Sequence, residues 1–170
     1  MKPPACKLFA IFLIAACAHI TSAKAQNDAQ KGPNKACRSI KDIKAPQLYG
    51  MWQVSFTNPP AGLPTVATLL LEMHEEFSDS LQGVVTRKLP ALQIAKDSHA
   101  PKAALAGDVE DGFVILDESS NNISISGTWN GELVQASCGR DVNGVWKDTS
   151  ASAPPDAPDV AFTMVKRPGW

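Results

Sequence analysis

The sequence lacks a marked excess of charge of either sign. Its 170 residues carry 16 Lys and Arg against 17 Asp and Glu, which gives a formal net charge of −1. Nucleic-acid-binding domains have a basic surplus, so this balance argues against that class. An apolar fraction of 44% at so low a net charge also argues against a wholly disordered chain. We therefore expect one globular domain and no nucleic-acid partner.

Catalytic and metal-binding motifs are also missing. The sequence contains no Gly-x-Ser-x-Gly elbow, no His-Glu-x-x-His helix, no phosphate-binding glycine loop and no zinc-spaced cysteine cluster. Two candidate histidines remain: His74 lies beside Glu75 and Glu76, and His99 lies near Asp97. A metal-binding or acid–base role can be drawn for either, but we interpret both as exposed turn and loop residues. We predict no catalytic residue, no metal and no cofactor.

A hydrophobic run long enough to cross a membrane is missing as well. The apolar run Leu8–Ile20 has 13 residues, whereas a membrane-spanning helix needs about 20. Two lysines precede the run, and Ala23 and Ala25 form a small-x-small cleavage site after it. This arrangement predicts a secretory signal peptide over residues 1–25. We expect the folded protein to be periplasmic or secreted.

The same leader carries an alternative signal. Ile14-Ala15-Ala16-Cys17 resembles the lipobox of bacterial lipoproteins, which implies lipidation of Cys17 and an anchor in a bacterial membrane. Membrane association is expected only in that case. Cleavage at Gln26 instead removes three basic residues and no acidic ones, so 13 basic residues face 17 acidic ones and the net charge becomes −4.

Two cysteines lie outside the leader, Cys37 and Cys138. In an oxidising compartment two such residues most simply form one disulfide. The bridge would close a loop of about 100 residues, worth up to about 4.7 kcal/mol in the chain-entropy model. Two free thiols or half a metal site are the alternatives, but no further ligands lie nearby in the sequence.

The rest of the chain is dominated by short strand patterns. Residues 26–46 are mostly polar and predict an arm, with one helical turn within 36–44 and a break at Pro46. Beyond it, apolar and polar residues alternate, as at Trp52, Val54 and Phe56. Asn130-Gly131 is the sharpest hairpin signal. Eight or nine strands are expected, near 52–57, 66–74, 81–87, 103–109, 112–117, 123–129, 132–138, 142–146 and 160–166.

Glycine recurs in one strand pattern. Five segments have the form apolar-x-Gly-x-apolar: Leu48–Trp52, Leu81–Val85, Leu105–Val109, Ile125–Trp129 and Val142–Trp146. All three defining positions face the same side of a strand, and an inward glycine lets a strand bend sharply. Repeated bends close a sheet on itself. We predict an all-β fold, an antiparallel up-and-down barrel of about eight strands over 47–170.

The start of the barrel segment resembles a known group. Leu48-Tyr49-Gly50-Met51-Trp52 is similar to the first strand of calycin-type barrels, the lipocalins and more closely the avidins, and the bacterial periplasmic metalloprotease inhibitors share this start. The resemblance implies an eight-stranded barrel and a disulfide from before the first strand to a late one. It also implies structural roles for Gly50 and Trp52, with Lys166 or Arg167 packed over that indole as a cation–π contact.

Two binding functions follow as hypotheses. The mouth of such a barrel is a usual place for a small ligand. Trp129 and Trp146 are expected to form the walls of an apolar site, with Tyr49 supplying a hydroxyl, unless these aromatic residues only fill the core. The leading hypothesis is therefore an exported, non-catalytic protein that binds a small apolar molecule.

The alternative partner is an exported protein. Long segments carry function on a rigid scaffold, and three are expected here: residues 26–44, 88–102 and 149–159. A protease inhibitor would insert the N-terminal arm into an active-site cleft, with Cys37 tying that arm to the barrel.

Overall fold

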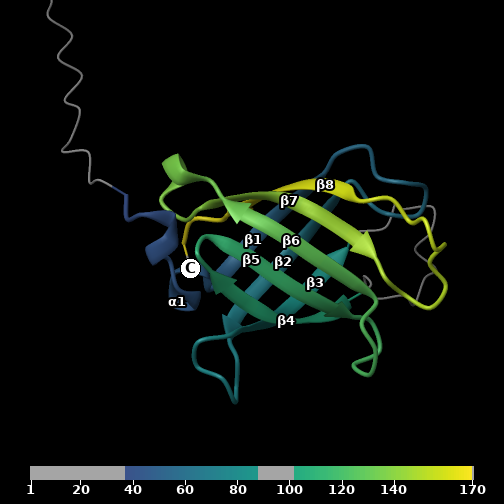
Figure 1. Cartoon of the computed structure of the whole chain (residues 1–170), viewed down its shortest axis with the longest axis horizontal. Helices are drawn as coiled ribbons and strands as arrows, with labels where there is room; N and C mark the ends of the chain where they lie inside the picture. Colours follow the sequence, from purple (N-terminus) through teal and green to yellow (C-terminus); the bar gives the residue numbers. More distant parts are fainter. Residues whose placement is uncertain (1–36, 88–101, 170) are drawn as a thin grey trace, which may run out of the picture. The chain divides into compact units, whose positions relative to one another are not determined.

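The computed structural model describes residues 37–87 and 102–169, which form a closed antiparallel β-barrel (Figure 1). Eight strands follow one another in chain order, and the last pairs with the first. The predicted all-β up-and-down barrel is thus confirmed. The strands are β1 (Gly50–Phe56), β2 (Val66–Met73), β3 (Leu81–Arg87), β4 (Lys102–Glu110), β5 (Phe113–Ser119), β6 (Gly127–Leu133), β7 (Asp141–Asp148) and β8 (Val160–Lys166).

Short helical segments lie at one end of the barrel. The four-residue helix α1 (Ala45–Leu48) precedes β1, and 3-10 helices span Ile40–Asp42 and Gln135–Ser137. The predicted break at Pro46 is wrong, because α1 runs through this residue. Pro46 lies in the first turn of the helix, where its missing N–H costs no helical hydrogen bond. None of the helices among the described residues has the length and apolar character that crossing a membrane requires.

The two ends of the barrel differ, and we call them the base and the mouth. The base carries α1 and the β2–β3, β4–β5 and β6–β7 turns, and it lies to the left in Figure 1. The mouth carries the β1–β2 loop (57–65), the β5–β6 loop (120–126) and the β7–β8 loop (149–159).

The interior of the barrel is filled by side chains from alternate strand positions. Trp52, Val54 and Phe56 of β1 are buried, whereas Gln53 and Ser55 between them are exposed. The largest fully buried side chains are apolar: Trp52, Trp129, Leu48, Leu69, Leu71, Leu81, Leu116, Met164, Val54, Val85 and Val142. An eight-stranded barrel has an interior that such side chains just fill.

The repeated glycines lie where neighbouring strands approach closely. A Cβ added at Gly83, Gly107 or Gly144 would collide with the backbone of the adjacent strand. This close approach of the neighbouring backbone is therefore possible for glycine alone. The copy at 125–129 departs from the pattern, because Ile125 precedes β6 and is 49% exposed.

The predicted hairpin at Asn130-Gly131 is wrong, since β6 continues straight through both residues. Gly131 faces inward and pairs with Gly144 of β7. A Cβ there would lie 2.5 Å from Cγ1 of Val142, so this glycine is required for packing and not for a turn. The expected strand at 132–138 is likewise replaced by the end of β6 and the 3-10 helix.

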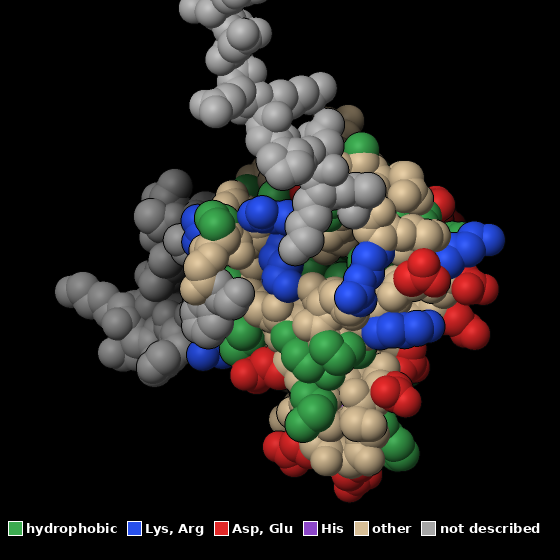
Figure 2. Space-filling model, turned by 90° about the vertical axis from the view of Figure 1, so that its left-hand side faces the viewer, with side chains coloured by type: hydrophobic (Ala, Val, Ile, Leu, Met, Phe, Trp, Pro, Cys, Tyr) green, Lys and Arg blue, Asp and Glu red, His purple; other side chains and the backbone are tan. Residues whose placement is uncertain are grey.

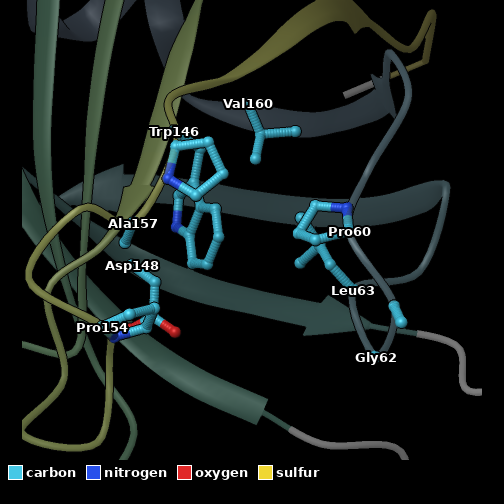
Figure 3. Close-up of a pocket in the computed structure, with 10 residues that line it drawn as sticks. Pro60, Gly62, Leu63, Trp146, Asp148, Pro154, Ala157 and Val160 are labelled. Carbon is cyan, nitrogen blue, oxygen red and sulfur yellow. The ribbon is translucent and has the colours of Figure 1, made fainter.

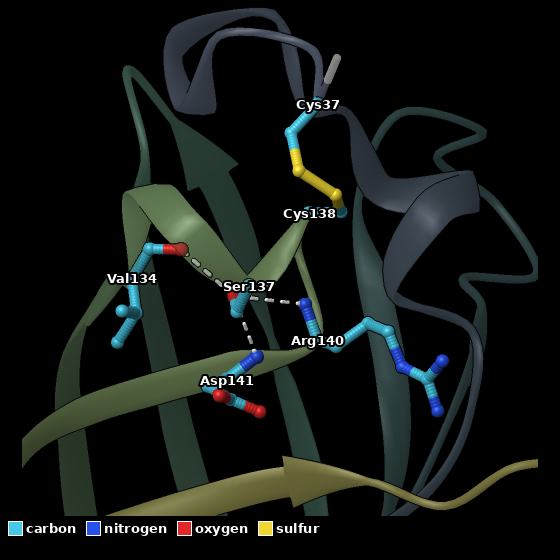
Figure 4. Close-up of a disulfide and its surroundings, with 6 residues drawn as sticks. All are labelled: Cys37, Val134, Ser137, Cys138, Arg140 and Asp141. Carbon is cyan, nitrogen blue, oxygen red and sulfur yellow. Dashed lines mark hydrogen bonds between the residues drawn. A yellow bond between two sulfur atoms is a disulfide. The ribbon is translucent and has the colours of Figure 1, made fainter. Parts of the chain in front are cut away.

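The chain turns between β6 and β7 beside the disulfide (Figure 4). Cys37 and Cys138 are bonded, 101 residues apart in sequence, which confirms the predicted bridge. Cys138 has φ 56°, a left-handed conformation that closes the turn. The Ser137 hydroxyl donates to the Val134 carbonyl at 2.7 Å and accepts from the Asp141 N–H at 3.0 Å. The bridge therefore joins the N-terminal segment to an internally hydrogen-bonded turn at the base.

Candidate functional site

An aromatic cluster lies inside the mouth. Trp129 of β6 and Trp146 of β7 are directly paired across the two strands, and both are buried, with 1% and 7% exposure. Their ring centroids are 6.4 Å apart in an edge-to-face arrangement. The ring centroid of Phe56 lies 5.6 Å from that of Trp129, and the ring centroid of Phe162 lies 5.2 Å from it. The structure thus brings the two predicted tryptophans together in one packed group.

A buried ion pair holds these indoles in place. Glu118 of β5 is the one buried polar side chain among the described residues, at 4% exposure. Its Oε2 accepts from Nε1 of Trp129 at 3.0 Å and of Trp146 at 3.1 Å. Arg87, at the end of β3, donates to both carboxylate oxygens at 2.6 Å. The guanidinium carbon also lies 5.8 and 5.3 Å from the two ring centroids.

This geometry fits a structural role for Glu118. A bidentate arginine–carboxylate pair is strong and directional, and both carboxylate oxygens are already engaged by the protein. The hydrogen bonds to Glu118 therefore fix the orientation of both indoles. Sequence reasoning missed Arg87 and Glu118, although a signal existed: Glu118 continues the inward alternation of Val114 and Leu116, and Arg87 follows Val85 at the same spacing.

A pocket of about 320 Å³ opens at the mouth, outside Trp146 (Figure 3). In Figure 3, Trp146 stands on one side, Pro60 and Leu63 face it from the β1–β2 loop, and Asp148 adds a carboxylate beside it. Most of the lining is apolar: Pro60, Ala61, Gly62, Leu63, Trp146, Asp148, Pro154, Ala157, Pro158 and Val160. Ligand sites commonly have this character, mostly apolar with few polar groups, and begin near 300 Å³.

Tyr49 does not join this group. It lies just before β1, at the base, and its hydroxyl donates to the Ser78 carbonyl at 3.5 Å. The two tryptophans and Tyr49 are thus at opposite ends of the barrel. The reason is the direction of β1, which carries the chain from Tyr49 at the base to Phe56 at the mouth.

The residues implied by the family resemblance close the base. Nζ of Lys166 lies 5.9 Å from the Trp52 ring centroid and donates to the Gln47 carbonyl at 2.6 Å. The Trp52 Nε1 donates to the Leu48 carbonyl at 2.8 Å. Lys166 therefore provides the cation over the indole, whereas Arg167 contributes its backbone N–H to the Met51 carbonyl.

Gly50, which begins β1 two residues before Trp52, has φ 126°. L-amino-acid side chains rarely allow this backbone conformation, so glycine is required there.

The remaining candidates divide between turns and undescribed segments. The ring nitrogen Nδ1 of His74 accepts from the N–H groups of Glu76 and Phe77 at 3.2 and 3.3 Å, so this histidine caps the β2–β3 turn. His99 and Cys17 lie outside the described residues. Within residues 37–87 and 102–169, no three His, Cys, Asp or Glu side chains are grouped to hold a metal ion.

Comparison with known proteins adds no family. No family model matches the chain, and no curated protein matches it.

Proposed function

We propose that this protein is an exported, non-catalytic binding protein that holds a small, largely apolar ligand in the mouth pocket. The observation that carries the proposal is the apolar pocket of about 320 Å³, with Trp146 on one side and Leu63 facing it. It is built on the rim of a closed barrel, which is a rigid scaffold for such a site.

The ligand is proposed to lie on the outer side of Trp146. Trp129 and Trp146 contact each other edge to face, with 6.4 Å between ring centroids, and leave no space for a ligand between the rings. The hydrogen bond from Trp146 to Glu118 fixes the indole, so little side-chain entropy is lost on binding. Asp148 at the pocket edge favours a ligand with one hydrogen-bond donor on an otherwise apolar body.

Tryptophan fluorescence tests this proposal. Pools of small apolar compounds should change the emission of the folded protein, and a hit should raise its melting temperature. Leu63→Ala removes apolar contact from the pocket and should weaken binding by about five- to tenfold. Ile115→Ala is the matched control, because Ile115 is 53% exposed on the outer face of β5 and outside the pocket. Equal weakening by both variants, or no response to any pool, would contradict the proposal.

We also propose a family relation and a cellular location for this protein. The closed eight-stranded barrel with a Gly-x-Trp start and one disulfide supports a relation to the calycin-type barrels. The leader supports export with cleavage before Gln26, or lipidation at Cys17 as the alternative. Mass spectrometry of the mature protein separates the two, because lipidation leaves an acylated N-terminal cysteine.

A further inference from the structure

A second pocket lies at the base, far from the apolar pocket of the mouth. It has a volume of about 460 Å³ and is bordered by α1, the β6–β7 turn and the segment after β8. Its lining includes three cationic side chains, Arg140, Lys166 and Arg167, together with Gln47. Figure 2 shows this end of the barrel, where Lys and Arg side chains gather near the middle of the face.

Two of these cations oppose each other across paired strands. The backbone N–H of Lys166 donates to the backbone carbonyl of Arg140 at 2.8 Å. The two residues are next to Asp141 and Val165, which are paired between β7 and β8. Like charges placed opposite each other on neighbouring strands destabilise a sheet. The neighbouring acid does not relieve this repulsion, because Figure 4 shows the Arg140 side chain directed away from Asp141. Within the described residues, the single ion pair is Arg87–Glu118 at the mouth.

The cations also retain hydrogen-bond donors. An ammonium group has three N–H donors and a guanidinium has five. Lys166 uses one of its donors on the Gln47 carbonyl. Partial burial and the nearby charge of Arg140 lower the pKa of Lys166 below its usual value, which agrees with a positive charge that has no anion paired with it within residues 37–87 and 102–169.

We propose that this base pocket binds a phosphoryl group, held by Arg140, Lys166 and Arg167. A phosphoryl group carries negative charge and several acceptor oxygens, which match the forked donors of arginine and the point charge of lysine. Its binding would neutralise the repulsion between Arg140 and Lys166. The group would come from a soluble phosphate ester or from a phospholipid headgroup. The proposal does not depend on the ligand of the mouth.

Calorimetric titration of the folded, disulfide-bonded protein with inorganic phosphate tests the soluble source, with chloride at matched ionic strength as the reference. Arg140→Ala and Arg167→Ala should each weaken phosphate binding roughly tenfold or more, because each removes a charge-assisted hydrogen bond. Lys147→Ala is the matched control, since it removes the same charge from an exposed position of β7 outside the pocket. Both arginines are exposed, so their variants should fold normally, as circular dichroism would verify.

Vesicle co-sedimentation tests the lipid source. Binding to phosphatidylglycerol vesicles that Arg140→Ala weakens and Lys147→Ala preserves would support a headgroup as the ligand. Phosphate binding with the same pattern and no vesicle binding would support a soluble ester. Binding to neither probe, or equal loss in the Lys147→Ala control, would overturn the proposal, because the charges would then act only as a diffuse surface field.

Discussion

Replacing Glu118 by alanine tests how the mouth is held together. The change leaves the Arg87 guanidinium without a paired carboxylate. Because the Arg87 side chain is only 13% exposed, water can compensate this charge only in part. It also removes the acceptor of two buried indole N–H groups. Removing one partner of a buried ion pair costs about 3–5 kcal/mol of unfolding free energy. For a domain of this size, that loss lowers the melting temperature by roughly 10–20 °C.

A double variant distinguishes two contributions to the unfolding free energy: the loss caused by leaving one charge unpaired and the stabilisation that the ion pair provides. Arg87→Met with Glu118→Gln removes both charges and keeps a side-chain oxygen that accepts from the indoles. The double variant should therefore lose less stability than the sum of its single variants, with a coupling of roughly 1–3 kcal/mol. Urea unfolding, followed by tryptophan fluorescence, gives the unfolding free energies of the unchanged protein, of Arg87→Met, of Glu118→Gln and of the double variant. A loss below about 1 kcal/mol for Glu118→Ala, or additive losses in the cycle, would refute this account.

Three further predictions concern separate parts of the molecule. Gly131→Ala should cost about 1–3 kcal/mol by overpacking against Val142; a loss below about 0.5 kcal/mol in urea unfolding would contradict the packing role. Because the folded-state pKa of Lys166 is lowered, the folded protein releases this proton before the unfolded chain does, so stability should rise with pH from that lowered pKa up to 10.5. Arg140→Ala should reduce this rise in stability. Identical alkaline unfolding profiles for this variant and the unchanged protein would contradict the prediction. If the protein inhibits a protease through its arm, deletion of residues 26–36 should abolish inhibition without changing the melting temperature, whereas intact inhibition would exclude that mechanism.

Much of the fold could be predicted because each strand carries local information. Alternation placed β1, β2 and β3 within a few residues, and the recurring glycines indicated a sheet that bends until it closes. The hairpin predicted at Asn130-Gly131 is wrong for a physical reason. The dipeptide favours a tight turn locally, but the inward position of Gly131 and its pairing with Gly144 outweigh that preference.

The candidate site was less predictable, because it depends on which strands meet around the barrel. The distance between Trp129 and Trp146 follows from the register of β6 against β7, which the two sequences alone do not specify. Arg87 and Glu118 are 31 residues apart and are joined only when β3 and β5 flank β4. Tyr49 lies apart from the tryptophans because it directly precedes β1, and β1 starts at the base of the barrel.

The disulfide divides the barrel into a covalent ring and an appended hairpin. The ring formed by the bond from Cys37 to Cys138 contains strands β1 to β6, whereas β7 and β8 follow it in the chain. One backbone cut inside the ring would leave both fragments attached until the bond is reduced. Loss of β8 would leave the ring intact, yet it would expose the unpaired edges of β1 and β7. The disulfide thus keeps β1 to β6 covalently attached to one another after a backbone cut. The absence of exposed strand edges depends instead on β8.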